Sequence, residues 1–333
     1  MNEFELIARY FTASRYSDDV KLGVGDDAAV VCVPTGFQLV AAVDTIVEGG
    51  HFPVGSAAED IAYRALAVNL SDIAAMGAIP KWFTLSLCVP TVTETWLGGF
   101  AQSLNELAAR FDVQLIGGDT VKGPLNISIQ ILGIVEQDRW LRRSGAKPGD
   151  LIFVSGVPGE AAGGLNTLLH NDSRATLDGD NKHVSHLVQR FLKPEPRIAL
   201  GRALRPFASA AMDISDGLLG DLGKLCRASG CGASLQLEKL PHSPSLVAMY
   251  GPQRAEQLSL SGGDDYELLF TIAPHHLAEV ERVSSQCGVS CTHIGSIDNS
   301  GGVACSRGNQ PVTINQVGYD HFALNDMSVM IDI

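Results

Sequence analysis

The sequence predicts a two-domain protein of mixed α/β structure, and three observations support this. The chain has 333 residues, whereas single domains usually have about 100–200. Apolar residues make up 45% of the chain and 35 residues are glycine, while aromatic residues reach only 6%. This composition suits short turns and close backbone approach, as in α/β proteins. Apolar segments of strand length also occur between longer segments of helical periodicity.

The first part of the chain predicts both helices and strands. Residues 58–76 give the clearest helix, with Leu66, Leu70 and Ile73 forming an apolar side and Gly77 ending it. The other expected helices are residues 3–11 and 95–111. The expected strands are residues 22–33 (two strands around a turn), 38–44, 82–89, 113–116 and 126–135.

A basic, turn-rich segment at residues 142–150 marks the expected domain boundary. We therefore predict domains of residues 1–145 and 146–333. The second domain should begin with a strand, followed by a glycine-rich turn, a helix and an exposed polar loop. The expected elements here are the strands 151–155, 209–212 and 266–272, the loop 170–182 and a helix that ends near residue 228.

Charge and cysteine content limit the class of protein. The formal charge is −13, from 24 basic and 37 acidic side chains, which disfavours binding to nucleic acid or to anionic membranes. The seven cysteines are scattered with no C-x-x-C pair, so we expect reduced thiols in a cytoplasmic protein. The sequence shows no signal peptide and no apolar run of the roughly 20 residues that a membrane span needs.

Several aspartates follow apolar strands at tight turns, namely Asp26 and Asp27, Asp44, Asp119, and Asp213 with Asp216. The carboxyl ends of strands in open α/β sheets face the ligand-binding crevice. If these carboxylates meet there, their mutual repulsion requires cations in the site. Each aspartate taken alone also suits a turn or a helix cap, so their number supports a site more than any one position does.

Asp72 lies inside the predicted helix 58–76, three residues after Asn69, so the two side chains share a side of the helix. Ala65 belongs to that same side, whereas Arg64 does not. A carboxylate among apolar residues is costly without a partner. Asp72 is therefore expected either to bind a cation or to pair with a nearby basic side chain.

The residue types favour Mg²⁺ over zinc. Carboxylates combined with substrate phosphates are typical magnesium ligands, and the chain has no HExxH motif and no Cys/His cluster at zinc spacing. Arg143 and Lys147 offer positive charge for phosphates, although the same segment suits a solvated linker. No Walker A motif is present, and the turn at residues 156–159 suits a structural turn better than an anion cradle. His51, in a glycine-flanked loop, is a weaker candidate for ligand contact.

Eight segments in order resemble the thiamine-monophosphate kinase family, which belongs to the superfamily of aminoimidazole-ribonucleotide synthetase. They extend from about residue 3 to residue 322, and together they are far more specific than any one motif. The segments are GDDAAV from Gly25, VDTIVEGGHF from Val43, NLSDIAAMGA from Asn69, GGDT from Gly117, RSGAKPGD from Arg143, DISDGL from Asp213, SGGDDYELLF from Ser261 and GYDHF from Gly318.

This resemblance implies a two-domain enzyme that transfers a phosphoryl group from ATP to thiamine monophosphate in line, without a phospho-enzyme. It implies a homodimer whose N-terminal domains pair into a barrel-like sheet and bind ATP and several Mg²⁺ ions, while the C-terminal domain completes the substrate site. The implied Mg²⁺ ligands are Asp27, Asp44, Asp72, Asp119, Asp213 and Asp216. The implied ATP contacts are Gly118, Asp119, Arg143 and Ser215, and the implied thiamine-phosphate contacts are His51, Asp264 and Tyr319. The residues expected to matter most for catalysis are Asp44, Asp119 and Arg143.

The chain departs from the family pattern at two places. Ala42 and Val43 stand where the family usually has hydroxyl residues, so one metal ligand type is lost there. Asp264 stands where the family usually has Glu, which shortens a substrate contact by one methylene. Alternative functions are another ATP-dependent enzyme of the superfamily, a metal-dependent phosphohydrolase and a nucleotide- or thiamine-phosphate-binding protein without turnover.

Overall fold

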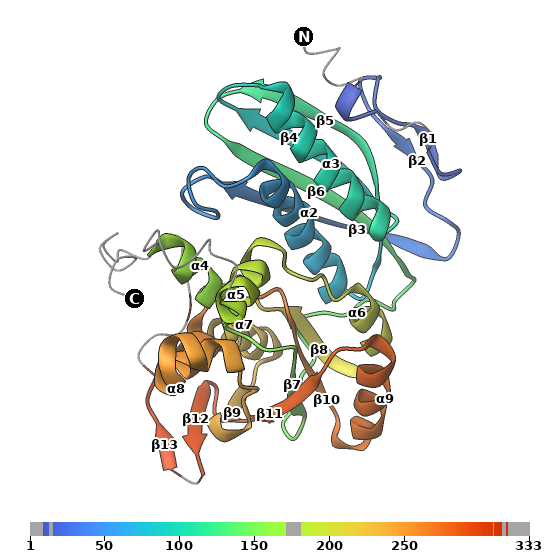
Figure 1. The fold of residues 1–333 in the computed structure, drawn as a ribbon. Coiled ribbons are helices and arrows are strands. Elements are labelled where there is room, and N and C mark those ends of the chain that lie inside the picture. The colour runs from blue at the N-terminus through green and yellow to red at the C-terminus, as the bar shows by residue number, and fades with distance from the viewer. Residues whose placement is uncertain (1–8, 13–15, 171–180, 309, 315–317, 319–333) are drawn as a thin grey trace. The chain divides into compact units, whose positions relative to one another are not determined.

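The computed structural model describes residues 9–12, 16–170, 181–308, 310–314 and 318 (Figure 1). The chain divides into two compact units. The first unit comprises Met1–Trp140 and Pro196–Arg205, and the second comprises Leu141–Glu195 and Pro206–Ile333. The first unit is therefore assembled from two separate stretches of sequence. In the described parts of the chain, no helix is both long enough and apolar enough to cross a membrane.

The first unit is built on a four-stranded sheet, and a separate two-stranded ribbon, β1-β2, precedes this sheet in the sequence. The sheet has the order β3-β6-β4-β5, in which only the β4–β5 pair is parallel. Its elements are β1 (Val20–Leu22), β2 (Val30–Val31), β3 (Phe37–Val47), α2 (Ala58–Ala75), β4 (Ile79–Val89), α3 (Glu94–Arg110), β5 (Gln114–Lys122), β6 (Asn126–Glu136) and α6 (Ile198–Leu204).

The two faces of this sheet differ in burial. Helices α2 and α3 lie over the sheet (Figure 1), and α2 contacts β6. Alternate residues of β6, Ile127, Ile129 and Ile131, are at most 1% exposed and share one face of the sheet. On the other face four apolar side chains remain 38–62% exposed, namely Leu39, Val43, Val47 and Val121. This open face is an exception to the usual burial of such residues.

The returning segment Pro196–Arg205 packs against the first unit through close backbone contact and an ion pair. A Cβ at Gly201 would overlap the carbonyl of Ala74 at the end of α2, so α6 approaches α2 only because this residue is glycine. Arg205 pairs with Glu136 at the end of β6. These contacts attach to the first unit a segment that begins more than 50 residues after Trp140, where the first stretch of that unit ends.

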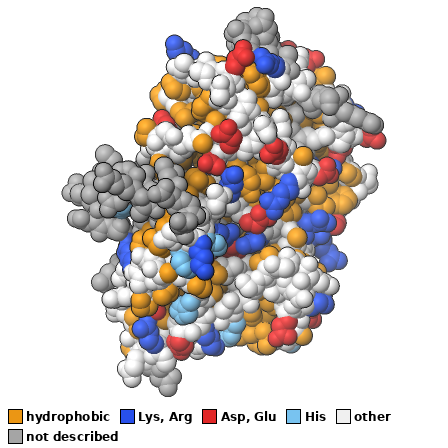
Figure 2. All heavy atoms as spheres, viewed as in Figure 1, with side chains coloured by type: hydrophobic (Ala, Val, Ile, Leu, Met, Phe, Trp, Pro, Cys, Tyr) orange, Lys and Arg blue, Asp and Glu red, His pale blue; other side chains and the backbone are white. Residues whose placement is uncertain are grey.

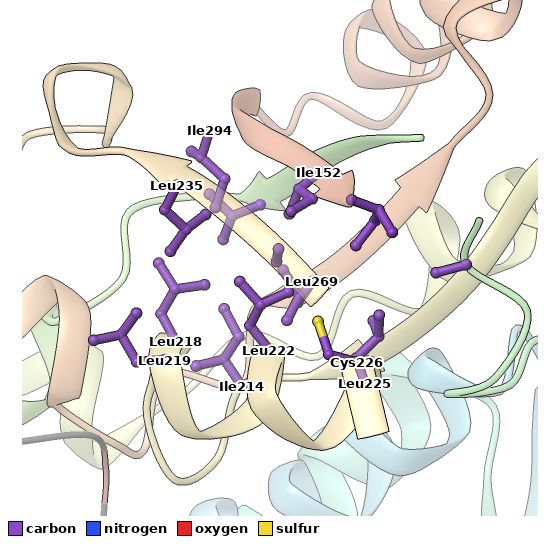
Figure 3. Packing of buried hydrophobic residues seen from close by; sticks show 14 of the residues in the cluster. Ile152, Ile214, Leu218, Leu219, Leu222, Leu225, Cys226, Leu235, Leu269 and Ile294 are labelled. Atoms are coloured by element: carbon purple, nitrogen blue, oxygen red, sulfur yellow. The ribbon is translucent and has the colours of Figure 1, made fainter. Parts of the chain in front are cut away.

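The second unit contains a seven-stranded sheet in the order β13-β12-β9-β11-β7-β10-β8, in which only the β12–β9 pair is parallel. Its strands are β7 (Leu151–Ser155), β8 (Ala208–Asp213), β9 (Gly232–Gln236), β10 (Leu268–Ile272), β11 (Cys291–Asp298), β12 (Val303–Arg307) and β13 (Gln310–Val312). Its helices are α4 (Glu160–Leu169), α5 (Lys182–Leu192), α7 (Leu218–Ser229), α8 (Pro244–Ser261) and α9 (Leu277–Cys287). Figure 3 shows Leu218, Leu222 and Leu225 of α7 packed against Leu235, Leu269 and Ile294 of the sheet.

Most predicted elements are confirmed, but two predicted strand ends are wrong. The helix expected at residues 58–76 is α2, with Met76 as its C-cap and Gly77 in the left-handed conformation behind it. The strand expected to end at Asp44 continues to Val47, because each of its residues pairs with β6. The strand expected at residues 113–116 likewise continues through Asp119 to Lys122. The predicted helix at residues 3–11 and loop at 170–182 lie mostly outside the described residues.

Candidate active site

Asp44 lies inside β3, where its backbone amide donates to the side-chain oxygen of Asn69 on α2 at 3.0 Å. Asn69 is 1% exposed, and its side-chain nitrogen donates to the carbonyl of Ala65 at 2.9 Å. Asp72, half-buried, follows Asn69 by three residues on the same helix. The structure therefore places Asp44 and Asp72 beside the same side chain, as the sequence predicted for Asn69 and Asp72.

The side of α2 that carries Arg64 and Ser71 is buried as well, since these residues are 1% and 0% exposed. The helix is buried on nearly all sides, since α3 and the sheet both pack on it. Arg64 donates through Nε to the carbonyl of His51 at 3.2 Å. The buried Arg64 thus helps to fix the loop that contains His51, a predicted substrate contact.

His51 lies in the loop after β3, and its ring is turned back onto that strand. Its Nδ1 accepts a hydrogen bond from the amide of Val47 at 3.2 Å, which leaves Nε2 as the ring atom directed away from this bond. The amide of Gly49 also donates to the carbonyl of Phe52 at 2.8 Å. The loop conformation is therefore set by its own backbone and by Arg64.

Gly118 and Asp119 lie on β5, at the other edge of the sheet. A Cβ at Gly118 would overlap the carbonyl oxygen of Leu85 on β4, so only glycine allows the two strands this close. Asp119 is exposed and pairs in register with Ser86. Ser86 in turn pairs with Ser128 of β6, and Ser128 with Thr45 of β3.

The strand register separates Asp44 from Asp119. Asp119 shares a row with Thr45, and residues in a row share a face, so Asp119 and Asp44 lie on opposite faces. Three strand spacings of about 4.8 Å also lie between β3 and β5, which makes about 14 Å. Magnesium ligands bind at about 2.1 Å. One ion therefore cannot bind both carboxylates within a single copy of the chain.

Asp27 lies in the turn between β1 and β2. It is exposed, and its amide donates to the side chain of Asp26 at 2.9 Å. Gly25 just before it has φ +120°, a conformation that favours glycine. This turn therefore presents two adjacent carboxylates to solvent, as the motif predicted.

In the second unit, Asp213, Ser215 and Asp216 belong to one short segment at the end of β8, residues 213–217. We call it the nucleotide loop because the family resemblance predicts that Ser215 contacts ATP. Asp213 ends β8 and is 5% exposed. The amides of Ser215 and Asp216 both donate to Oδ2 of Asp221 at 3.0 Å. Asp221, on the first turn of α7, is fully buried. The loop is therefore anchored by a carboxylate that the sequence analysis did not identify.

Lys224 places a positive charge directly on this loop. Its Nζ contacts Asp216 and also Oδ1 of Asp221 at 2.8 Å. Burial raises the pKa of Asp221, although Lys224 opposes that effect. The pKa of Lys224 is raised by these two carboxylates, against the effect of burial. Lys224 thus already compensates the charge of a predicted metal ligand.

Asp264 lies in the segment 262–267, which we call the acceptor loop because the family resemblance predicts that Asp264 contacts the acceptor substrate. Asp264 and Tyr266 have φ of +70° and +52°, which is unusual for residues with a side chain. The hydroxyl of Tyr266 contacts Oδ1 of Asp264 at 3.4 Å. The amide of Asp264 donates to the carbonyl of Ser215 at 2.8 Å, so the acceptor loop and the nucleotide loop are joined.

Arg143 is exposed, and its carbonyl accepts from the hydroxyl of Ser229 at the end of α7 at 3.3 Å. The same hydroxyl accepts from the amides of Gly145 and Ala146 at 3.2 Å. The basic turn is therefore tied to α7 and is more than a solvated linker. Tyr319, the remaining predicted substrate contact, lies outside the described residues.

The turn at residues 156–159 was expected to be a structural turn more than an anion cradle, and its contacts agree with that. The amides of Gly159 and Ala161, at the start of α4, donate to the carboxylate of Asp265 at 2.6 and 3.2 Å. Desolvation raises the pKa of Asp265 well above its ordinary value. The turn is thus closed by the protein's own carboxylate. Among the described residues, no three His, Cys, Asp or Glu side chains gather closely enough to hold a metal ion.

Comparison with known proteins agrees with this two-unit arrangement. The N-terminal domain of AIR synthase related proteins matches residues 25–135, and their C-terminal domain matches residues 147–306. The thiamine-monophosphate kinase of Escherichia coli K12 is 47% identical over 323 residues, covering 96% of this chain and 98% of that protein. The Bacillus subtilis thiamine-monophosphate kinase is 34% identical, with 97% and 100% covered.

Solved structures give the same result. The crystal structure of a thiamine-monophosphate kinase from Stenotrophomonas maltophilia superposes with a TM-score of 0.82 at 43% identity, covering 87% of this chain and 92% of that one. The structure of AaThiL complexed with AMPPCP and TMP has a TM-score of 0.76 at 30% identity, with 87% and 89% covered. Escherichia coli HypE, at 19% identity and a TM-score of 0.76, shares the fold.

Proposed function

The chain belongs to the thiamine-monophosphate kinases of the AIR synthase-related family, and we propose that it transfers the γ-phosphoryl group of ATP to thiamine monophosphate. The products are ADP and thiamine diphosphate. The observation that carries this proposal is the similarity over nearly the whole length to curated thiamine-monophosphate kinases. A relative bound to AMPPCP and TMP supports the same pair of substrates.

The residue chemistry fits magnesium as the accompanying cation. The proposed ligands are all carboxylates, which are hard oxygen donors of the kind that Mg²⁺ prefers: Asp27, Asp44, Asp72, Asp119, Asp213 and Asp216. Bound Mg²⁺ supplies charge neutralisation between the donor and acceptor phosphates. Lys224 on Asp216 supports the view that this group of carboxylates needs positive charge.

The protein's part in the reaction is to bind and orient the two phosphates. A terminal oxygen of thiamine monophosphate forms the new bond to the γ-phosphorus, and the bond between that phosphorus and ADP breaks. The acceptor phosphate has a second pKa of about 6, so it is already an anion near neutral pH and needs no strong base. Transfer then depends on alignment and charge stabilisation.

We assign the binding roles from the loops that the structure describes. Arg143, exposed on the turn tied to α7, contacts the ATP phosphates together with Ser215 and Gly118. His51 and Asp264 contact thiamine monophosphate, and Tyr319 is assigned there by the family motif alone. Asp264 is shorter than the Glu usual in the family, so its contact is expected to include a water molecule.

We also propose that the enzyme is a homodimer formed through the open face of the β3-β6-β4-β5 sheet. The exposed Leu39, Val43, Val47 and Val121 support this, because a surface with several uncovered apolar side chains favours a protein partner. Asp119 lies on this open face, whereas Asp44 lies on the face that α2 covers, so we place the two carboxylates in different metal sites.

A cytoplasmic location belongs to the same proposal. All seven cysteines are free thiols, which is usual in a reducing compartment. The charged surface on the face shown in Figure 2 has acidic and basic side chains interspersed. Neither observation points to a nucleic-acid or membrane partner, which agrees with the net charge of −13.

A single assay tests the activity. The purified protein is incubated with ATP, Mg²⁺ and thiamine monophosphate, and the products are separated by chromatography. Parallel reactions contain unphosphorylated thiamine or no acceptor. The proposal expects equal amounts of ADP and thiamine diphosphate, formed only with the monophosphate. ADP without thiamine diphosphate would instead indicate a phosphohydrolase, and no ATP consumption would indicate a binding protein.

A further inference from the structure

The acceptor loop is held in a conformation that its own residues disfavour. Asp264 and Tyr266 both adopt positive φ, of +70° and +52°, where the side chain crowds the backbone. Such a conformation persists only when the surrounding contacts impose it. The residue between them, Asp265, is 1% exposed. The contacts of this buried side chain are therefore the ones expected to impose the conformation.

Asp265 fastens the acceptor loop to the start of α4. Its two carboxylate oxygens accept from the amides of Gly159 at 2.6 Å and of Ala161 at 3.2 Å. These amides have no partner within the helix, and the helix dipole favours a negative charge at this end. Asp265 is buried against the start of α4, whereas Asp264 and Tyr266 on either side of it are partly exposed. Asp264 is thus directed by the anchoring of its neighbour.

Glu267 fastens the other end of the acceptor loop. Its carboxylate accepts from Arg190 of α5 at 2.7 Å and from the hydroxyl of Ser155 at 2.5 Å. A Cβ at Gly156 would overlap this carboxylate, so it occupies a space that only glycine leaves open. Arg190 also contacts Glu160 at 3.3 Å. The loop therefore has two buried carboxylate anchors, both fixed to the helical layer.

The nucleotide loop has a separate anchor. Asp221 accepts from the amides of Ser215 and Asp216 at 3.0 Å and is held by Lys224 at 2.8 Å. The two loops are also joined by three backbone hydrogen bonds of 2.8 Å, from the amides of Asp264, Tyr266 and Ile214 to the carbonyls of Ser215, Ile214 and Glu267, respectively. The loops share these backbone bonds but have different side-chain anchors, namely Asp265 for the acceptor loop and Asp221 for the nucleotide loop.

We propose that Asp265 is the positioning residue for the acceptor and Asp221 the positioning residue for the nucleotide. Each acts through the backbone of its own loop and touches neither substrate. This inference rests on the proposed function, because that function assigns Asp264 to thiamine monophosphate and Ser215 to ATP. It predicts that the two buried carboxylates control the binding of different substrates.

The test compares Asp265→Asn with Asp221→Asn in the full-length protein. Asparagine keeps the shape of the side chain but offers one acceptor oxygen, so one backbone amide loses its partner in each variant. For Asp265→Asn, we expect the KM for thiamine monophosphate to rise about 10-fold or more while the KM for ATP changes less than about 3-fold. For Asp221→Asn, we expect the reverse. Glu256→Gln, which removes the surface partner of Arg307, should leave both KM values unchanged.

Binding measurements keep the test independent of turnover. Calorimetric titration with thiamine monophosphate alone, and with a non-hydrolysable ATP analogue and Mg²⁺, should show the same split between the two variants. A purely structural role would instead lower thermal stability and weaken both ligands equally in both variants, which would overturn the inference. If Asp265→Asn does not fold, Ser155→Ala loosens Glu267 with a smaller expected rise of about 3-fold in the KM for thiamine monophosphate alone. An equal change in both KM values there would also overturn it.

The wild-type protein separates this inference from the proposed function. If wild type makes no thiamine diphosphate, the proposed function fails whatever the variants do. If wild type is active and the two variants show no difference in substrate preference, the proposed function stands and only the positioning roles fail.

Discussion

The side-chain oxygen of Asn69 accepts a 3.0 Å hydrogen bond from the backbone amide of Asp44. The side-chain nitrogen of Asn69 donates to Ala65 one turn earlier in the same helix. Asn69 thus links α2 to the middle of β3, where no tight turn exists to fix the carboxylate. The position of a proposed metal ligand is therefore set by a buried amide on a neighbouring helix.

Asn69→Ala should therefore reduce both stability and activity. The amide of Asp44 would lose its partner in a half-buried place, which costs about 1–3 kcal/mol of unfolding free energy. Misplacement of Asp44 should lower kcat/KM by about 10-fold or more. Urea denaturation and steady-state kinetics measure the two effects. Asn126→Ala, which removes one hydrogen bond to Pro124 in the same unit, is the matched control and should change neither appreciably.

The sequence predicted an element correctly where the apolar periodicity and the residues typical of helix or strand ends indicated the same element. Helix α2 has an apolar seam and a terminal glycine, and its predicted bounds are nearly those observed. The nucleotide loop follows an apolar strand and precedes a helix, so Asp213 and Asp216 were placed correctly. Asp44 and Asp119 were expected at strand ends because each follows an apolar segment at a predicted turn. They lie mid-strand because pairing along the sheet continues past them.

The contacts that position the site depend on residues distant in sequence. Asp265 meets Gly159 across 106 positions, and α6 joins the first unit after a whole stretch of the second. Local periodicity contains no signal for either. Helix α8 was missed because Gly251, with φ +75°, and Pro252 interrupt it. Asp221 had a usable signal, since it lies among Leu218, Leu222 and Leu225 on α7, where an unpartnered carboxylate would be costly.

Acid should weaken the attachment of the returning segment Pro196–Arg205. The hydrogen bond from Arg205 holds the pKa of Glu136 below its ordinary value. A group whose pKa is lower in the folded state stabilises the fold above its unfolded pKa, about 4.3 for Glu. That contribution is lost as the pH falls through the lower, folded value. Unfolding free energy should therefore drop below about pH 4.3 in wild type, and this part of the drop should be absent in Glu136→Gln.

Denaturation series between pH 3 and pH 6, each about half a unit apart, resolve this window. Because Glu136 is half-exposed, solvent and salt screen the pair and the difference should be small. Glu256→Gln, which breaks the ion pair with Arg307 in the other unit, controls for loss of a surface carboxylate. Identical pH profiles for wild type and Glu136→Gln would contradict the role of this pair.

Lys224→Met should tighten Mg²⁺ binding. Lys224 contacts both Asp216 and Asp221, so its charge competes with a divalent ion at Asp216. Without it the carboxylates retain their full repulsion, which lowers stability in the absence of Mg²⁺ and should increase Mg²⁺ affinity by about 3- to 10-fold. Thermal denaturation across a Mg²⁺ titration measures both effects, and EDTA supplies the metal-free reference.

Lys239→Met is the control for this prediction, because Lys239 is an exposed lysine of the same unit. It should leave the dependence of melting temperature on Mg²⁺ unchanged. If Lys224→Met bound Mg²⁺ more weakly than wild type, Lys224 would assist Mg²⁺ binding. That result would contradict a competition between Lys224 and Mg²⁺ for Asp216.

Asp44→Asn and Asp119→Asn should each abolish turnover while the protein remains folded. The strand register puts the two carboxylates on opposite faces of the sheet and about 14 Å apart, so each substitution should remove a different metal site. Calorimetric titration with Mg²⁺ and a non-hydrolysable ATP analogue should show a different loss of Mg²⁺ binding in each variant, and both losses in the double variant. Near-wild-type turnover in both single variants would contradict the metal assignment.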